Sequence, residues 1–524
     1  MSLFARKPVG VAATQGEATA LRRVLGRWQL TALGIGAIVG AGIFSATGTA
    51  IAGAADHPGA GPALMVSYLG VAVACGFAAL CYAEFASMIP EAGSAYTYAY
   101  ATLGELIAWI IGWDLIIEYA VGNIAVAVSW SGYFQSLLRG FGFAFPDWLA
   151  TDYLTASQGA HAVGAALAQH AALGSIPVEV RGAAQAFADA PRLLGVPVIF
   201  NLPAILIVAA ITWVLVRGVR ESAWFNTAMV VVKLAFLIFF MAIGAFYVRP
   251  ANWHPFMPNG IHGAWVGAAL IFFAYIGFDA VSTAAEESRN PQKDMPFAII
   301  ASLIITTILY VIVTAVLTGL VPWHVLNTAD PLATAFINRG LNVSAGLIAF
   351  GAVVATTSVL LVFQLGQPRI FYSMARDGLL PPWAAKVHPK YHTPHVTTIL
   401  TGLFVGGFAA IAPIGVVIEL TNIGTLFAFI LVAIGIMVLR HLEPDRARPF
   451  RTPLVPVVPA LAVLSCFGLA LGLPWETWAR FAIWLLIGLV IYFAYGRKHS
   501  VLQRRLRGEA VEPVAPPLPG GEKV

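Results

Sequence analysis

Charged residues and cysteines are scarce in this sequence. Only 10% of its 524 residues are charged, against roughly a quarter in a soluble domain, and 59% are hydrophobic. This scarcity excludes a soluble globular protein and predicts a polytopic membrane protein of the all-α class. The three cysteines lie in or beside apolar segments and are too few for a disulfide framework or a metal cluster. We interpret them as small hydrophobic residues: Cys75, Cys81 and Cys466.

Catalytic and signalling signatures are also missing. The sequence contains no HExxH or GxSxG motif and no pair of carboxylates in an aqueous segment, which argues against an enzyme. The loop histidines lack the i, i+4 spacing of a helical metal site. We therefore expect no catalytic residue, no metal and no cofactor. Both tails are short, which argues against a sensor with an appended signalling domain.

Apolar segments dominate the chain. Twelve of them approach the ~20 residues that a transmembrane helix needs. The third and eighth are overlong, and we expect them to project into water. The segments are 29–52, 62–89, 100–135, 196–217, 223–247, 263–288, 296–320, 343–375, 395–412, 414–440, 454–473 and 478–496.

Lysine and arginine are distributed unevenly between the two sides of these segments. If both termini are cytoplasmic, 23 of the 30 lie on the cytoplasmic side, six lie outside, and Lys233 lies within a span. Positive residues are retained on the cytoplasmic side, so this imbalance predicts that orientation. The net charge of +5 is then a topology signal, and no nucleic-acid partner is expected. The six outer residues are Arg139, Arg181, Arg192, Arg249, Arg339 and Arg480.

Three polar regions lie outside the spans. Residues 1–27 are basic and have no cleavage site, so we expect the first span itself to direct membrane targeting. The loop 137–195 is rich in alanine and histidine, and short surface helices are expected there. Residues 508–524 have the composition of a disordered tail.

The first span contains a weak point. Four glycines fall within residues 34–42, and each weakens a helix by ~1 kcal/mol relative to alanine. If the helix unwinds at Gly40-Ala41-Gly42, the amide end of the next half-helix suits a carboxylate, and the freed carbonyls opposite suit an ammonium. The alternative is a close helix-packing face of the small-xxx-small type. A phosphate-binding loop is excluded because no Lys-Ser or Lys-Thr follows.

The sixth span has a second weak point, in FFAYIGFDAVSTAAEESRNP (272–291). An apolar helix reaches Gly277 and becomes acidic at Asp279 without an intervening loop. Two interrupted helices in corresponding places are typical of a secondary transporter, with the ligand held between them. Phe273, just before the break, can act as a lid. Asp279 can cap the following half-helix or join a polar network.

Three further ionisable residues fall within spans. Lys233 is costly in a bilayer, by roughly 3 kcal/mol, unless it is paired, neutral or snorkelling to the cytoplasmic surface. As a buried amine it is a candidate proton carrier. Asp114 and Glu118 lie one turn apart on one helix face. Glu118 can pair with Lys233, line the site or accept a proton; the alternative is a polar contact between helices.

These motifs resemble the amino acid–polyamine–organocation superfamily, and most closely bacterial members of its cationic amino acid transporter branch. The resemblance covers residues 30–135 and 200–440, and the order of several motifs makes it specific. It is carried by Gly36–Phe44, PEAGSAYTY (90–98), GELIAWIIGWDLIIEY (104–119), Phe272–Pro291, GQPRIFYSMARDGLLP (366–381) and ELTNIGTLFAF (419–429).

The resemblance implies a LeuT-like fold of twelve transmembrane helices in a bacterial inner (plasma) membrane. Helices one and six are discontinuous, and two five-helix repeats have inverted topology. The implied divisions are a cytoplasmic tail 1–28, a first repeat 29–247 with the extracellular loop 137–195, a second repeat 263–440, helices eleven and twelve at 454–496, and a disordered cytoplasmic tail 497–524.

The same resemblance implies the roles of individual residues. Amides around Ala41 and Gly42 bind the substrate carboxylate, next to the flexible positions Gly40 and Gly277. Carbonyls at Ile38, Phe273, Ala274 and Ile276 bind the ammonium, and Phe273 is the aromatic gate. Lys233 falls where proton-coupled relatives place a lysine and sodium-coupled ones an ion. The expected coupling ion is a proton, and its candidate carriers are Lys233, Glu118 and Asp279.

The substrate side chain is less well constrained. Many relatives have Gly-Ser/Thr-Gly where this chain has Gly40-Ala41-Gly42, so one hydroxyl contact is missing. Phe363 leaves little room for an arginine and favours a small neutral amino acid (Ala, Ser or Thr), whereas Glu118 favours a cationic one. The predicted function is proton-coupled uptake of an L-amino acid by alternating access. An exchanger or facilitator of amino acids or polyamines is the alternative, and a small partner subunit is left open.

Overall fold

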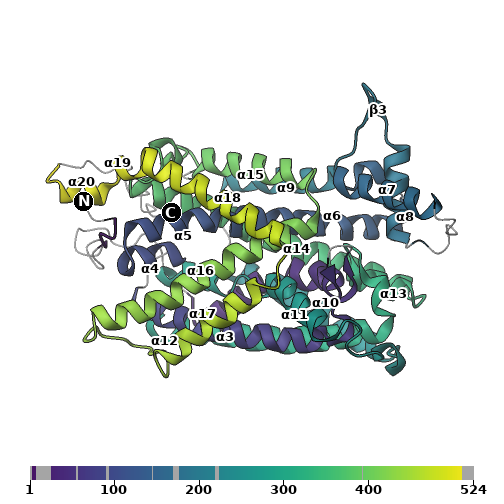
Figure 1. Ribbon diagram of the computed structural model, residues 1–524, viewed down its shortest axis with the longest axis horizontal. Helices are drawn as coiled ribbons and strands as arrows, with labels where there is room; N and C mark the ends of the chain where they lie inside the picture. The colour runs from purple at the N-terminus through teal and green to yellow at the C-terminus, as the bar shows by residue number, and fades with distance from the viewer. Residues whose placement is uncertain are drawn as a thin grey trace.

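Helices of this chain run roughly side by side along the long axis of the molecule (Figure 1). The computed structural model describes residues 3–7, 25–54, 57–89, 94–143, 145–168, 176, 178–218, 223–391 and 393–509. Most of the predicted tail 1–28, the motif residues 90–93 and the end of the predicted disordered tail, 510–524, therefore lie outside the described residues.

Twenty α-helices account for most of the described chain. They are α1 (Arg27–Ile38), α2 (Thr47–Ala52), α3 (Leu64–Met88), α4 (Ser94–Thr102), α5 (Glu105–Ile116), α6 (Gly122–Gly140), α7 (Tyr153–Ala168), α8 (Val178–Asp189), α9 (Leu202–Arg217), α10 (Ala223–Ala245), α11 (Gly260–Ile271), α12 (Pro291–Leu320), α13 (Pro331–Ile337), α14 (Asn342–Arg376), α15 (His395–Ala409), α16 (Ile414–Leu442), α17 (Val457–Ala470), α18 (Trp475–Ile491), α19 (Arg497–His499) and α20 (Val501–Leu506).

Strands occur only as two short antiparallel ribbons within the described residues. One pairs β1 (Gly53–Ala54) with β2 (His57–Pro58), and the other pairs β3 (Arg192–Leu193) with β4 (Val196–Pro197). Both ribbons lie in connections between helices, so the prediction of an all-α membrane protein is confirmed.

Nine helical stretches in the described residues are long and apolar enough to cross a membrane, and three shorter apolar helices accompany them. Each overlaps one of the twelve predicted segments. The nine are Arg27–Ala52, Gly61–Met88, Glu105–Gly140, Thr227–Ala245, Gly260–Ser282, Pro291–Leu320, Asn342–Arg376, Ile414–Leu442 and Trp475–His499; the shorter ones are α9, α15 and α17.

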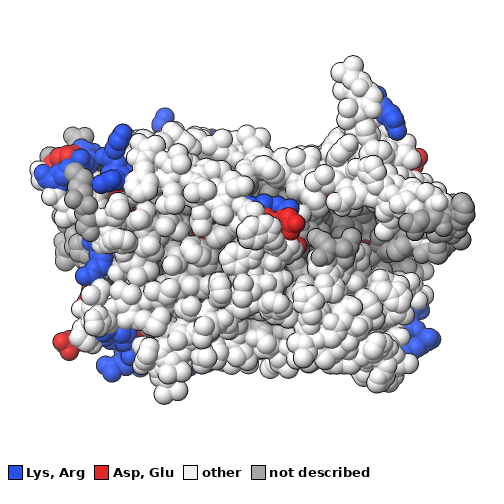
Figure 2. Space-filling view, in the orientation of Figure 1, with Lys and Arg blue, Asp and Glu red and all other residues white. Residues whose placement is uncertain are grey.

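The outer faces of these helices are apolar. On α12, Ile304, Ile308 and Ile312 are exposed at successive i, i+4 positions. An exposed apolar stripe of this kind is stable against lipid and unstable against water. Figure 2 agrees, because most of the flank between the two ends of the molecule is free of charged side chains. We conclude that the chain is a multi-pass membrane protein.

The two ends of the bundle differ. Helices α4, α19 and α20 lie at one end, and α7, α8 and the β3–β4 ribbon lie at the other (Figure 1). Helices α7 and α8 pack against each other and confirm the surface helices expected in the loop 137–195. We refer to these ends as the α4 end and the α7 end.

Candidate functional site

The first helix is interrupted where its glycines predict. Helix α1 ends at Ile38, Val39 and Gly40 leave the helical conformation, and a π-helical turn runs through Gly42–Ala46 before α2. Glycine lowers the cost of leaving the helix at this point. The interruption frees the last carbonyl groups of α1, which have no amide partners further along the helix.

Buried side chains satisfy those freed carbonyls. The Nζ of Lys233, on α10, donates to the carbonyl oxygens of Gly36 at 2.5 Å and Val39 at 3.0 Å, and to the Ser358 hydroxyl at 3.2 Å. The Tyr310 hydroxyl donates to the carbonyl of Ile38 at 2.9 Å. A cation at the carboxyl end of a helix also interacts favourably with the helix dipole.

This arrangement excludes two of the alternatives for Lys233. Its side chain is fully buried, so it does not snorkel to the surface. Its hydrogen-bond partners within the described residues are two carbonyls and a hydroxyl, so the proposed pairing with Glu118 is not formed. Lys233 instead holds the interrupted end of α1 in place.

The second interruption lies in the predicted sixth span. Helix α11 ends at Ile271 and continues as a 3₁₀ turn through Phe272–Tyr275, after which Ile276 is extended and Gly277 has a φ of +119°. The Asp279 carboxylate accepts a hydrogen bond from the Gly277 amide at 3.2 Å. Asp279 therefore closes the turn before the next 3₁₀ segment, 279–287, rather than capping that segment from its first residue.

Asn422, on α16, stabilises this second interruption. Its Nδ2 donates to the carbonyl oxygens of Ala269 at 2.8 Å and Leu270 at 2.9 Å, at the end of α11. Asn422 is not among the residues predicted to form the site. The sequence does carry a signal for Asn422, which is its polar side chain within an apolar span. A buried amide there requires a polar partner.

The two interruptions touch each other. A Cβ atom at Gly42 would lie 2.2 Å from the Cα of Ala274, and one at Gly277 would lie 2.9 Å from the carbonyl carbon of Ala37. Only glycine permits backbone segments to approach so closely. The positive φ of Gly277 adds a second requirement for glycine at that position.

A small cavity lies between the interruptions. Its volume is ≈ 10 Å³, which is room for about one water molecule. It is lined by seven of the predicted substrate-binding residues: Ile38, Gly40, Ala41, Gly42, Phe273, Ile276 and Phe363. The other two, Ala274 and Gly277, are buried next to this lining. All nine are thus brought together.

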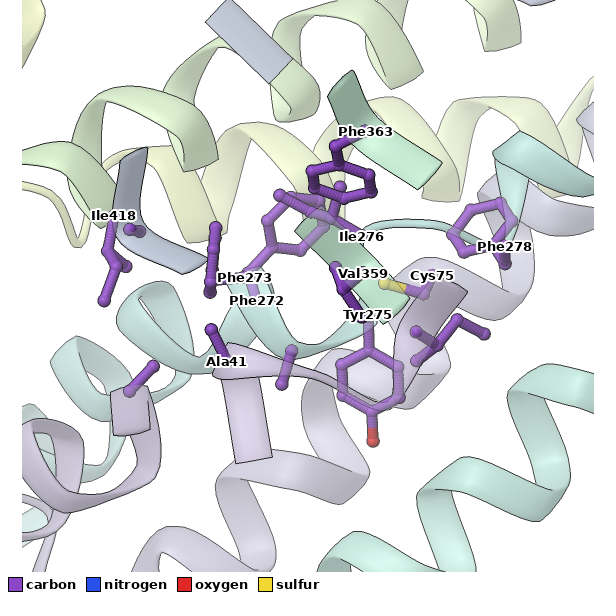
Figure 3. Close-up of a cluster of buried hydrophobic side chains, with 14 of the residues drawn as sticks. Ala41, Cys75, Phe272, Phe273, Tyr275, Ile276, Phe278, Val359, Phe363 and Ile418 are labelled. Carbon is purple, nitrogen blue, oxygen red and sulfur yellow. The ribbon is translucent and has the colours of Figure 1, made fainter. Parts of the chain in front are cut away.

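Three lining residues were not predicted: Ala37, Val126 and Val359. They are aliphatic residues in apolar helices, so nothing in the sequence distinguishes them from residues that face lipid. Figure 3 shows Phe363 and Val359 beside Phe273 and Ile276. No lining residue carries a charge, and two aromatic side chains dominate the wall. The chemistry of this surface suits a short apolar group.

Carboxyl groups lie beside the cavity rather than on its wall. Glu118 and Asp279 are buried and close enough to interact electrostatically, and Asp114 lies one turn before Glu118 on the same helix. The ring of Tyr119, the residue after Glu118, contacts the ring of Phe363 with centroids 5.6 Å apart. None of the predicted carboxylates belongs to the lining of the cavity.

Comparisons with known proteins show which proteins the chain is similar to. The sequence profile of the family described as "Amino acid permease" matches residues 25–493. The branched-chain amino acid permease BcaP of Bacillus subtilis is 47% identical over 506 residues, which cover 96% of this chain and 99% of that protein. The methylthioribose transporter of Bacillus subtilis is 43% identical, over 96% of this chain and 100% of that protein. Human cationic amino acid transporter 4 is 30% identical, over 93% of this chain and 89% of that protein.

Proposed function

The chain belongs to the amino acid permease family, and on that premise we propose that it takes up a neutral L-amino acid by proton-coupled symport with alternating access. One observation carries the proposal. Two interrupted helices meet around a cavity, and a buried lysine hydrogen-bonds to the freed carbonyls of the first. It is a transporter by family and not an enzyme.

The proposed architecture has twelve spans, made of the nine long helices together with α9, α15 and α17. We assign 29–247 and 263–440 to two repeats of inverted topology, because an interrupted helix begins each range. Both termini lie on the cytoplasmic side of a bacterial plasma membrane. The excess of lysine and arginine on that side supports this orientation.

The substrate backbone is proposed to bind at the interruptions. Its carboxylate meets the amide groups of Ala41 and Gly42, which open the second half of the first span. Its ammonium meets the carbonyls of Ile38, Phe273, Ala274 and Ile276. The Ile38 carbonyl already accepts from Tyr310, but a carbonyl oxygen has two lone pairs and can accept a second donor.

The substrate side chain is proposed to be short and aliphatic, from alanine to the branched-chain amino acids. The wall formed by Val126, Val359 and Phe363 is apolar. A cationic side chain would lose its hydration against this wall without gaining a charged partner. Glu118 lies outside the lining, which weakens the argument for a cationic substrate. The similarity to BcaP, a branched-chain amino acid permease, supports a neutral side chain.

Proton coupling is proposed to run through Lys233, with Glu118 and Asp279, which interact with each other, as further candidate proton carriers. When charged, Lys233 holds the carbonyl end of α1 through two hydrogen bonds. A neutral amine donates more weakly and has no charge to interact with the helix dipole. Gain and loss of a proton would therefore change how firmly the first interruption is held, and with it the binding site.

The proposal is tested by uptake into proteoliposomes without sodium. An inward proton gradient should drive accumulation of labelled leucine or alanine well above that of arginine, and a protonophore should abolish it. Protein-free vesicles provide the baseline.

Other outcomes identify the alternatives. Label that enters only preloaded vesicles indicates an exchanger. Accumulation of arginine alone would retain symport but contradict the apolar wall. Accumulation of methylthioribose without any amino acid would contradict the proposed substrate class.

A further inference from the structure

The β3–β4 ribbon ends in an exposed apolar tip. Leu194 is 98% exposed, Leu193 69% and Val196 58%. The ribbon, Arg192–Pro197, carries one charged residue, Arg192. A loop tip in water normally carries polar turn residues, because they form hydrogen bonds that leucine cannot.

The conformation of the turn makes leucine a costly choice. Leu194 has a φ of +52° and Gly195 a φ of +83°, so both central residues of this two-residue hairpin lie in the left-handed region. Such turns favour Asn-Gly or Asp-Gly. Leucine at Leu194 is therefore both strained and exposed, and asparagine would avoid both costs. A residue that is unfavourable on two grounds points to a contact outside the isolated chain.

The base of the ribbon is packed and fixed. The Val198 amide donates to the Pro191 carbonyl at 2.8 Å, and the Phe200 amide donates to the Trp148 carbonyl at 3.1 Å. Ile199 is buried in a small cluster with Ala156 of α7 and Ala186 of α8. These hydrogen bonds and the buried cluster fix the base of the ribbon, so its tip points in a defined direction.

The ribbon projects sideways from the helix bundle. In Figure 1 the ribbon stands off the molecule on the side where α9 and α15 lie. Helix α9 begins at Leu202, and its exposed Leu206 and Trp213 face lipid. Four residues separate Pro197, at the end of the ribbon, from Leu202, so the base of the ribbon lies at most about 18 Å from the start of α9. The tip therefore lies beside the bundle, at the end of the molecule where α9 begins.

We propose that the ribbon inserts its apolar tip into the bilayer surface at the α7 end of the molecule. Leu193, Leu194 and Val196 would enter the boundary between headgroups and acyl chains, and Arg192 would meet lipid phosphate groups. Apolar side chains next to a basic residue are the composition of segments that bind this interface. The ribbon would then anchor the α7–α8 pair at a fixed height beside the transport path.

A single cysteine tests this inference in the full-length protein. Cys75, Cys81 and Cys466 are buried, so a thiol-reactive NBD dye would label a Leu194→Cys variant at one accessible site. Ala162→Cys, on the exposed face of α7, is the matched control. Both variants are reconstituted into vesicles of equal parts phosphatidylcholine and phosphatidylglycerol, with and without lipids that carry a nitroxide near the headgroup.

The dye at position 194 should emit at shorter wavelength than the dye at 162 and be quenched several-fold more strongly by the nitroxide lipids. Adding Leu193→Asn and Val196→Asn should remove most of that difference. The inference is overturned if the two labels behave alike, or if quenching survives the two asparagines. It is also overturned if the shorter-wavelength emission is insensitive to the nitroxide lipids and fades when the protein is diluted, which would identify a second copy as the partner.

Discussion

At the residue scale, the amine of Lys233 holds the interrupted end of the first span through hydrogen bonds. The amine is fully buried and hydrogen-bonds to Gly36 and Val39. We expect Lys233→Ala to lose proton-driven accumulation while keeping part of the exchange of labelled substrate across preloaded vesicles. Lys233→Arg should behave similarly, because arginine keeps its proton throughout the cycle.

Ser358→Ala is the control for Lys233. It removes only the third and longest hydrogen bond of the amine, at 3.2 Å, and leaves the charge in place. Accumulation should therefore fall by no more than a few-fold. If Lys233→Ala accumulates substrate as the unmodified protein does, the proposed coupling role is wrong.

Asp330 gives a second prediction at the residue scale, at the α7 end of the molecule. Its carboxylate accepts from Ser136 on α6 and from Thr334 on α13. Burial raises the pKa of this carboxyl above its usual value, while the Ser136 hydrogen bond and the charge of Arg139 oppose the rise. The folded state thus holds the proton more tightly than the unfolded chain does.

The sign of the pH effect follows from that raised pKa. As pH rises from about 4 through the raised pKa, the unmodified protein loses folding stability. The total loss is about 1.4 kcal/mol for each unit by which folding raises the pKa of Asp330. Asp330→Asn cannot titrate and should not show this loss. Thermal unfolding of both proteins in detergent from acid to neutral pH should therefore show the variant gaining relative stability as pH rises. A difference that does not vary with pH would contradict the prediction.

At the element scale, the contact between the two interruptions depends on Gly42. A Cβ atom there would lie 2.2 Å from the Cα of Ala274, so the two segments would have to separate. We expect Gly42→Ala to lower stability by about 1–3 kcal/mol, as overpacking does, and to reduce uptake to background. Gly70→Ala is the matched control, because Gly70 is exposed on α3 and nothing lies within 4 Å of its added Cβ. Equal behaviour of the two variants would rule out a steric role for Gly42.

The interruptions show which features of such elements the sequence reveals. Glycines at 40, 42 and 277 are local departures from pattern that predict the breaks. The binding roles of Ile38, Phe273, Ala274 and Ile276 come from the family resemblance. Val126 and Val359 are ordinary in an apolar helix, and only packing brings them to the cavity. Tyr310 reaches the Ile38 carbonyl across 272 residues of sequence, so its role depends on a contact that no local pattern encodes.

At the scale of the whole molecule, the family resemblance predicted from ordered motifs is confirmed by the match over residues 25–493. In the described residues, nine long and three shorter apolar helices overlap the twelve predicted segments. The inverted relation of the two repeats and the direction of the termini stay predictions. They depend on how distant segments are arranged across a bilayer, which composition and charge indicate only indirectly.

Polar contacts link distant segments toward both ends of the bundle. At the α7 end, the Ser45 hydroxyl lies 2.5 Å from the Ser129 hydroxyl and also donates to the Ala329 carbonyl. At the α4 end, Asp377 pairs with Lys7 at 2.8 Å and accepts from the Tyr96 hydroxyl at 2.7 Å. With ≈ 10 Å³ between them, neither end admits an amino acid in this conformation. We propose that transport requires the two sets of contacts to open in turn.

Weakening one set should therefore favour opening at that end. Asp377→Asn removes a partly exposed ion pair, worth on the order of 1 kcal/mol, and should raise the population open at the α4 end about fivefold. Ser45→Ala should favour the α7 end instead. The reporter is Val126→Cys on the cavity wall, in a background in which Cys75, Cys81 and Cys466 are replaced by alanine. Its reaction with a membrane-impermeant thiol reagent is measured in vesicles of each orientation. Asp377→Asn should speed labelling only from the α4 side, and Ser45→Ala only from the α7 side. If both variants speed labelling from the same side, the two sets of contacts do not act as opposing gates.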